Sequence, residues 1–143
     1  MIDKIIGFIG AGNMGSAMIG GIVHSELVTT SQIIASAHSA ATLEKLQSAY
    51  SIETTLSNET VAERSDILFL AVKPNKFDEV IPQISSHIKS GCVIVSIAAG
   101  KTIAAIEDSF GKPVKLVRAM PNTPALVLSL IHISEPTRLR RIS

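Results

Sequence analysis

The chain has 143 residues, about the length of one domain; 46% of them are hydrophobic and 17% are charged. This composition excludes a disordered chain, which would be poor in apolar residues and rich in charge. A formal net charge of +1 and an aromatic content of 3% argue against nucleic acid as a partner. The apolar runs are far shorter than the roughly 20 residues that span a bilayer, so no membrane partner is expected.

The single cysteine, Cys92, excludes an internal disulfide, and the first residues lack the pattern of a secretory leader. Both observations indicate a cytoplasmic, reducing compartment. Cys92 opens an apolar run and is predicted to be a core thiol. No metal site is predicted, because no ligand spacing relates the four histidines, His24, His38, His87 and His132.

Short apolar runs alternate with segments of helical spacing in the first half of the chain. Strands are predicted at 5–9, at 33–35 and, more weakly, at 51–54. Helices are predicted at 14–24, at 40–50 and from Asn58, as N-cap, to Arg64.

The same alternation continues in the second half. A strand at 66–72 ends at Lys73-Pro74, and a helix follows at 77–88 with Pro82 inside it, where a kink or a restart is expected. A strand at 92–97, a helix at 103–110 capped by Thr102, and a strand at 114–117 complete the pattern. Strands that alternate with helices predict a single α/β domain with a doubly wound, mainly parallel sheet.

The strongest motif is a G-x-G-x-x-G between the first strand and the first helix, formed by Gly10, Ala11, Gly12, Asn13, Met14 and Gly15. Gly10 allows the tight turn, Gly12 lets a pyrophosphate approach the backbone, and Gly15 lets helix and strand pack closely. The free N–H groups of the helix then face the anion. This context predicts a Rossmann-type dinucleotide-binding fold.

The segment after the second strand bears on the choice of cofactor. An acidic residue there would accept a hydrogen bond from the ribose 2′-hydroxyl of NAD, but Ser36 to Ser39 contains none. This favours NADP, with NADPH preferred over NADH. The alternative is that Ser36 and Ser39 are ordinary turn residues and that His38 is solvated.

Five segments directly follow predicted strands: 10–15, 36–39, 73–74, 98–100 and 120–124. In a parallel sheet they share the carboxyl edge, where open α/β folds bind their ligands. Ordinary loop chemistry is the alternative for any one of them taken alone.

Four segments resemble pyrroline-5-carboxylate reductase in order and spacing: GFIGAGNMG at 7–15, FLAVKP at 69–74, SIAAG at 96–100 and RAMPNTPA at 118–125. The resemblance covers about residues 4–127, and the A-V-K-P and M-P-N-T-P-A segments are its most specific part. It implies the NAD(P)H-dependent reduction of 1-pyrroline-5-carboxylate to L-proline, the last step of proline biosynthesis.

The resemblance also implies roles for individual residues. The glycine loop would hold the pyrophosphate, and Ser36 and Asn58 would contact the adenosine ribose or its 2′-phosphate. The cofactor would further be lined by Ala71, Val72, Lys73, Pro74, Ala98 and Ala99, with Met120, Pro121, Asn122 and Thr123 beside the nicotinamide. No catalytic residue is predicted, since no residue is a convincing general acid.

In the family a helical second domain follows, forms the dimer and supplies the substrate site. Here residues 1–127 are expected to be the NAD(P)-binding domain, and residues 128–143 depart from the family pattern and carry three arginines near their end. We expect this tail to be read-through of foreign origin, with a genuine basic tail as the alternative. The chain is therefore expected to be the cofactor-binding half, inactive alone.

Two other functions remain open at this point. One is a non-catalytic dinucleotide-binding module, because the fold alone does not imply catalysis. The other is a related NADP-dependent reductase, either deazaflavin-dependent or a β-hydroxyacid dehydrogenase, against which the A-V-K-P and M-P-N-T-P-A segments argue.

Overall fold

The structure, a computed structural model, describes residues 4–10, 12–26, 28–97 and 102–118. Strands in these ranges form one sheet in the order β3-β2-β1-β4-β5-β6, and all neighbouring strands are parallel. They are β1 (Ile6–Ile9), β2 (Ile33–Ser36), β3 (Glu53–Thr55), β4 (Ile67–Leu70), β5 (Val93–Ser96) and β6 (Lys115–Arg118). The chain builds the sheet outward from β1 to β3 and then, from β4, in the opposite direction, which is the predicted doubly wound order.

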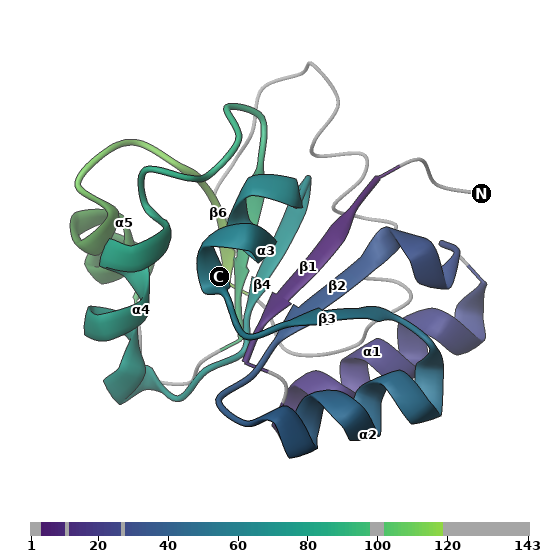
Figure 1. Cartoon of the computed structure of the whole chain (residues 1–143). Coiled ribbons are helices and arrows are strands. Elements are labelled where there is room, and N and C mark those ends of the chain that lie inside the picture. Colours follow the sequence, from purple (N-terminus) through teal and green to yellow (C-terminus); the bar gives the residue numbers. More distant parts are fainter. Residues whose placement is uncertain (1–3, 11, 27, 98–101, 119–143) are drawn as a thin grey trace.

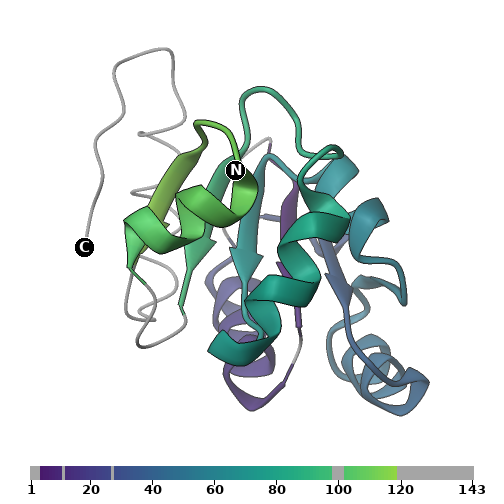
Figure 2. The same ribbon diagram turned by 90° about the vertical axis from the view of Figure 1, so that its left-hand side faces the viewer.

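Helices cover both faces of this sheet. The helices are α1 (Asn13–Ser25), α2 (Ala40–Tyr50), α3 (Asn58–Arg64), α4 (Phe77–Ile84) and α5 (Ile103–Phe110), with short 3₁₀ turns η1 (Thr30–Gln32) and η2 (Pro74–Lys76). α1 and α2 lie on one face, and α3, α4 and α5 lie on the other (Figures 1 and 2). The result is a three-layer α/β domain.

The four strands β1, β2, β4 and β5 are buried along their whole length, because each is covered on two faces. Alternate residues serve two aliphatic cores. Phe8 and Phe69 stack on the α1–α2 side, with ring centroids 4.7 Å apart. On the other side Leu68 of β4 belongs to the same cluster as Ile81 and Ile84 of α4. The predicted aliphatic core is thus divided between the two faces.

The helices α1 and α2 contact each other through a glycine. A Cβ atom at Gly20 would lie 2.7 Å from the Tyr50 hydroxyl oxygen, so a larger residue would displace the tyrosine side chain from α1. Tyr50 also lines a surface cavity together with Gly12 and Ser16. The tyrosine therefore lies between the helix pair and the glycine turn.

Three boundaries differ from the sequence prediction. The N-cap of α3 is Ser57, not Asn58: Ser57 has an extended backbone and its Oγ accepts from the Thr60 amide at 3.2 Å. α4 ends at Ile84 rather than at 88, and it runs through Pro82 as one helix without the expected restart. The weak strand predicted at 51–54 lies at Glu53–Thr55.

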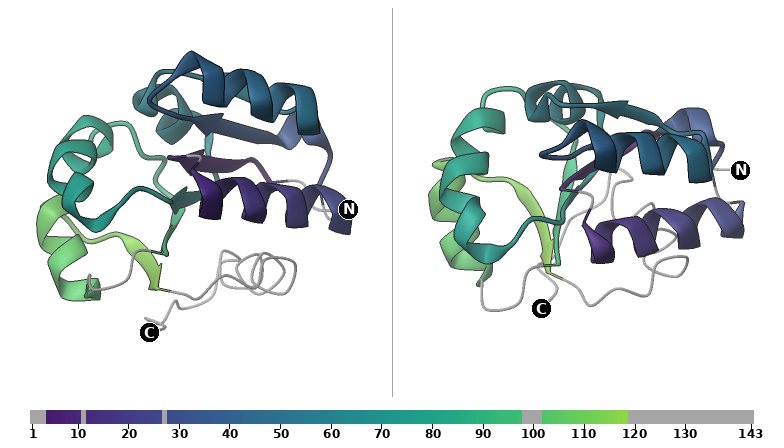
Figure 3. Two further views of the ribbon diagram at one scale, coloured as in Figure 1. Left: turned by 90° about the horizontal axis from the view of Figure 1, so that it is seen from below. Right: turned by 60° about the horizontal axis from the view of Figure 1, so that its bottom comes forward.

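Backbone hydrogen bonds tie the ends of three strands together at the carboxyl edge. The Gly10 amide donates to the Ser36 carbonyl at 3.1 Å, and the Ala71 amide donates to the Ile9 carbonyl at 2.8 Å. The left view of Figure 3, from below, faces this edge. The winding direction reverses between β1 and β4, so the crevice at this edge is a topological switch point, where doubly wound sheets bind ligands.

Candidate functional site

The glycine turn after β1 has three glycines in three different environments. Gly10 has φ +87°, and a Cβ there would lie 2.6 Å from Val72 Cγ1, so the turn requires glycine. A Cβ at Gly15 would lie 2.7 Å from the Gly10 carbonyl oxygen, so a larger residue would push α1 away from the turn. Gly12 is exposed, and a Cβ there would meet nothing within 4 Å. Space for a ligand therefore lies at Gly12.

The amino end of α1 lies at the same place. Gly12 is its N-cap and supplies no side-chain hydrogen bond, and no acidic residue stands in the first turn. The positive end of the helix dipole at this position favours an anion. Open space and uncapped amides together suit a pyrophosphate.

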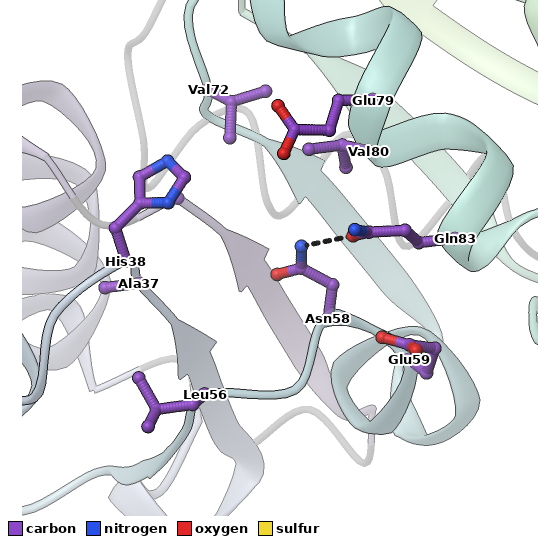
Figure 4. A pocket seen from close by; sticks show the side chains of 10 residues that line it. Ala37, His38, Leu56, Asn58, Glu59, Val72, Glu79, Val80 and Gln83 are labelled. Carbon is purple, nitrogen blue, oxygen red and sulfur yellow. Dashed lines mark hydrogen bonds between the residues drawn. The ribbon is translucent and has the colours of Figure 1, made fainter.

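Two adjoining cavities lie over the ends of β1, β2 and β4. The larger, about 380 Å³, is lined by Gly10, Ala37, His38, Leu56, Asn58, Glu59, Val72, Glu79, Val80 and Gln83 (Figure 4). The smaller, about 300 Å³, is lined by Gly10, Gly12, Ala37, His38, Thr42, Ala71, Val72, Lys73 and Lys76. The shared residues make this one continuous crevice at the switch point.

A chain of three side chains crosses the base of the larger cavity. Ser36 Oγ, at the end of β2, donates to Asn58 Oδ1 at 2.7 Å. Asn58 Nδ2 donates to Gln83 Oε1 of α4 at 2.9 Å (Figure 4). Ser36 is fully buried, whereas Asn58 and Gln83 line the cavity. We call these three residues the Ser36–Asn58–Gln83 relay; it joins β2, α3 and α4.

The crevice carries charges of both signs. Glu59 and Glu79 line the larger cavity, and Lys73 and Lys76 line the smaller one. Lys76 Nζ lies 3.8 Å from Glu79 Oε2, but both side chains are exposed, so this pair contributes little. The basic side is the side of Gly12, which suits anionic groups there.

Those predicted site residues that lie within the described ranges are close together in the structure. Gly10, Gly12, Asn58, Ala71, Val72 and Lys73 line the crevice. Asn13, Met14 and Gly15 form the start of α1, Pro74 begins η2, and Ser36 lies beneath Asn58. The others, Ala11, Ala98, Ala99, Met120, Pro121, Asn122 and Thr123, lie outside the described residues.

Sequence reasoning missed Glu59, Glu79 and Gln83. Glu79 and Gln83 are four residues apart on α4 and share one helix face, so the helical spacing contained the signal. What the sequence did not contain was the rotation of that helix on the sheet. Glu59 was overlooked although it follows a residue that was singled out.

Cys92 lies at the opposite edge of the sheet, just before β5. It is 3% exposed, and burial raises the pKa of its thiol to about 12. This confirms a core thiol.

Among the residues that the structure describes, no cluster of His, Cys, Asp and Glu could hold a metal ion. No helix within the described ranges has the length and apolar character needed to cross a bilayer.

A glycine turn of this geometry at the switch point of a doubly wound parallel sheet defines a dinucleotide-binding α/β domain. Residues 5–100 match the family described as NADP oxidoreductase coenzyme F420-dependent, and the chain belongs to this family.

The chain is similar to several pyrroline-5-carboxylate reductases. The protein of Escherichia coli K12 is 41% identical over 126 residues, which cover 88% of this chain and 47% of that protein. The Methanosarcina acetivorans protein is 39% identical, with 89% and 47% covered. The chain thus spans about half the length of the curated relatives it matches. The resemblance found in the motifs is confirmed.

Solved structures of pyrroline-5-carboxylate reductases are also similar to this chain. A pyrroline-5-carboxylate reductase from Coxiella burnetii superimposes with a TM-score of 0.79 at 31% identity, covering 88% of this chain and 47% of that one. Plasmodium falciparum pyrroline carboxylate reductase, solved with NADP bound, gives 0.73 at 32% identity, covering 89% and 45%. The predicted fold class is confirmed.

Proposed function

We propose that the chain binds NADPH in the crevice at the carboxyl edge of the sheet and is the cofactor-binding part of a cytoplasmic pyrroline-5-carboxylate reductase. The observation that carries the proposal is the open space at Gly12, beside the uncapped amino end of α1. The similarity to reductases of that name supports the choice of reaction. The substrate would be the small molecule 1-pyrroline-5-carboxylate.

The residues present fit the cofactor. The amides of the glycine turn, residues 10–15, would hold the pyrophosphate, and the end of β2 with Asn58 would hold the adenosine ribose. Ala71, Val72, Lys73 and Pro74 would line the dinucleotide, with Ala98 and Ala99 and then Met120 to Thr123 toward the nicotinamide. When bound, the nicotinamide would supply a hydride, and this chain's residues would orient it.

The preference for NADPH over NADH is part of the proposal. The residues 36–39 include no carboxylate to repel a 2′-phosphate. Lys73 and Lys76 contribute positive charge to the crevice, although Glu59 and Glu79 of the adjoining cavity oppose it and Glu79 lies 3.8 Å from Lys76. One or two hydrogen bonds to a charged group, at about 1.5–3 kcal/mol each, correspond to tenfold or more in affinity.

Calorimetric titration of the 143-residue chain with NADPH and with NADH tests the binding. We expect binding of both cofactors, with NADPH at least about tenfold tighter. Failure to bind either one contradicts the proposed site. Tighter binding of NADH contradicts only the preference.

The proposal extends to the complete reaction only through the relatives. Each is about twice as long as the match. We propose that the substrate-carboxylate site, the proton donor and the oligomer contact belong to the parts that the match does not cover. Residues 128–143 lie outside the described residues, and we propose that they contribute nothing to the cofactor site.

A further inference from the structure

The Ser36–Asn58–Gln83 relay has a direction. The Ser36 proton is bound by Asn58 Oδ1, and Gln83 Oε1 accepts from Asn58 Nδ2. A carboxamide carries its acceptor on one side and its donor on the other. Asn58 therefore turns its oxygen toward β2 and its nitrogen toward α4, as Figure 4 shows for the nitrogen.

This direction can be reversed while each member of the relay stays bonded to the next, with Ser36 Oγ changing from donor to acceptor. If both amides turn by half a rotation, Gln83 Nε2 donates to Asn58 Oδ1 and Asn58 Nδ2 donates to Ser36 Oγ. The serine hydroxyl permits this because it both donates and accepts. The difference that remains is the Asn58 atom on the β2 side of the cavity: oxygen in one direction, nitrogen in the other.

The two directions suit different ligands, and this step rests on the proposed function. A dinucleotide places its adenosine ribose at the end of the second strand. A ribose 2′-hydroxyl donates to the Asn58 oxygen. A fully ionised 2′-phosphate offers only acceptor oxygens and needs the Asn58 N–H.

We propose that Gln83 is a cofactor-specificity residue that acts through Asn58. Its neutral amide pairs with Asn58 in either direction, so a 2′-phosphate turns Asn58 without breaking the bond between Asn58 and Gln83. A carboxylate at position 83 only accepts, and it would hold the Asn58 oxygen on the β2 side. Gln83 is a positioning residue, since it lies at the far end of the relay from β2.

The test is the ratio of NADPH to NADH affinity in the Gln83→Glu variant of the full chain, measured by calorimetry at about pH 8, where a phosphate with a second pKa near 6 is ionised. We expect NADPH binding to weaken about tenfold and NADH binding to change less than about threefold. The Gln83 side chain is exposed, so the substitution leaves the packing intact.

The added charge alone would also repel a phosphate, so the experiment needs a double-mutant cycle. In an Asn58→Ala background the relay has lost its middle member. If Gln83 acts through Asn58, Gln83→Glu then changes the affinity ratio by less than about twofold, because contact residues couple and independent ones add. Direct repulsion between the new carboxylate and the phosphate would change the affinity ratio by the same factor with or without Asn58.

A second variant should shift the ratio of NADPH to NADH affinity in the opposite direction. In Gln83→Lys the ammonium group only donates, so it would hold the Asn58 nitrogen on the β2 side. NADH binding should then weaken relative to NADPH binding, again only while Asn58 is present.

An unchanged ratio in Gln83→Glu, or a shift that persists in Asn58→Ala, overturns the inference. If the unaltered chain binds neither cofactor, the proposed function fails first, before any variant is compared, and this inference fails with it.

Discussion

At the scale of single residues, the glycine turn separates structural from functional demands. Gly10 and Gly15 are required by the fold, because a Cβ at either would meet atoms within 2.6–2.7 Å. Gly12 has no such requirement: its φ of −74° and ψ of −161° suit any residue. A side chain at position 12 would enter the space assigned to the ligand.

Gly12→Val is therefore expected to abolish NADPH binding while the far-ultraviolet circular dichroism and the unfolding transition stay close to those of the parent. The Cβ atom of the new side chain would meet no protein atom within 4 Å, and the branched side chain fills the approach to the α1 amides. Titration and dichroism on one sample measure both properties. Unchanged affinity would mean that the turn is only structural.

Gly10→Ala is the matched variant, with the opposite expectation. The left-handed backbone at φ +87° and the contact with Val72 should lower the free energy of unfolding by at least about 1 kcal/mol. Urea denaturation measures it. A stability equal to the parent's would show that the turn adapts to a side chain.

The buried thiol makes a prediction about alkaline pH. The pKa of Cys92 is raised from 9.0 to about 12 by burial, so the unfolded chain loses this proton first as the pH rises. The contribution of Cys92 to stability is present below pH 9.0 and is lost between 9.0 and about 12. Denaturation at several pH values should show a steeper loss for the parent than for Cys92→Ala. Equal slopes would contradict the pKa shift.

At the scale of elements, α3 positions the relay. Ser57 caps this short helix, Asn58 is its first residue, and Ser65 at its other end donates to the Val61 carbonyl at 2.6 Å. The helix packs on β1 at Gly7, where a Cβ would meet Val61 Cγ1 at 2.7 Å. The position of Asn58 thus depends on the cap and on one glycine of the sheet.

Ser57→Ala is expected to lower the free energy of unfolding by about 1 kcal/mol and to weaken cofactor binding, because the start of α3 frays and Asn58 moves with it. Ser57→Asp, which keeps a capping oxygen, should restore both. Phe110→Leu on α5 provides the control: it removes buried contacts away from the crevice and should reduce stability without weakening binding. Equal binding losses in Ser57→Ala and Phe110→Leu would show a general effect of stability.

Element types could be predicted because strand and helix periods differ and because the four strands β1, β2, β4 and β5 are buried on both faces. The residues at which the elements begin and end were harder to predict. Ser57 and Asn58 are both good N-cap residues, so local chemistry did not decide between them. Pro82 marked a disturbance but not the residue at which α4 ends.

At the scale of the molecule, the doubly wound parallel sheet could be predicted from the alternation of strands and helices, and the edge proposed for the ligand from the position of the glycine motif. Gly10 and Val72 were correctly expected at one edge. The relay was not, because Ser36, Asn58 and Gln83 lie on three elements whose rotations only packing determines. The predicted contacts of Ala98, Ala99 and residues 120–123 stay predictions.

The activity of the whole chain is the last prediction. A reductase needs the imine carbon held about 3–3.5 Å from the hydride donor, together with a carboxylate partner and a proton donor. The match covers 47% of the E. coli relative, so we expect NADPH binding without oxidation that depends on pyrroline-5-carboxylate. Absorbance of the reduced nicotinamide at high protein concentration measures it. A robust substrate-dependent rate would overturn this expectation and would make Thr123 a candidate proton donor and Arg118 a candidate partner of the substrate carboxylate.

The contact between Gly20 and Tyr50 has an optical consequence. The sequence contains one tyrosine and no tryptophan, so the intrinsic ultraviolet emission of the protein comes from Tyr50 alone. This fluorophore lies where α2 docks on α1 and borders the cavity that Gly12 also lines. Its emission therefore reports both the undocking of the helix pair and the arrival of a nucleotide at the glycine turn, with no added label.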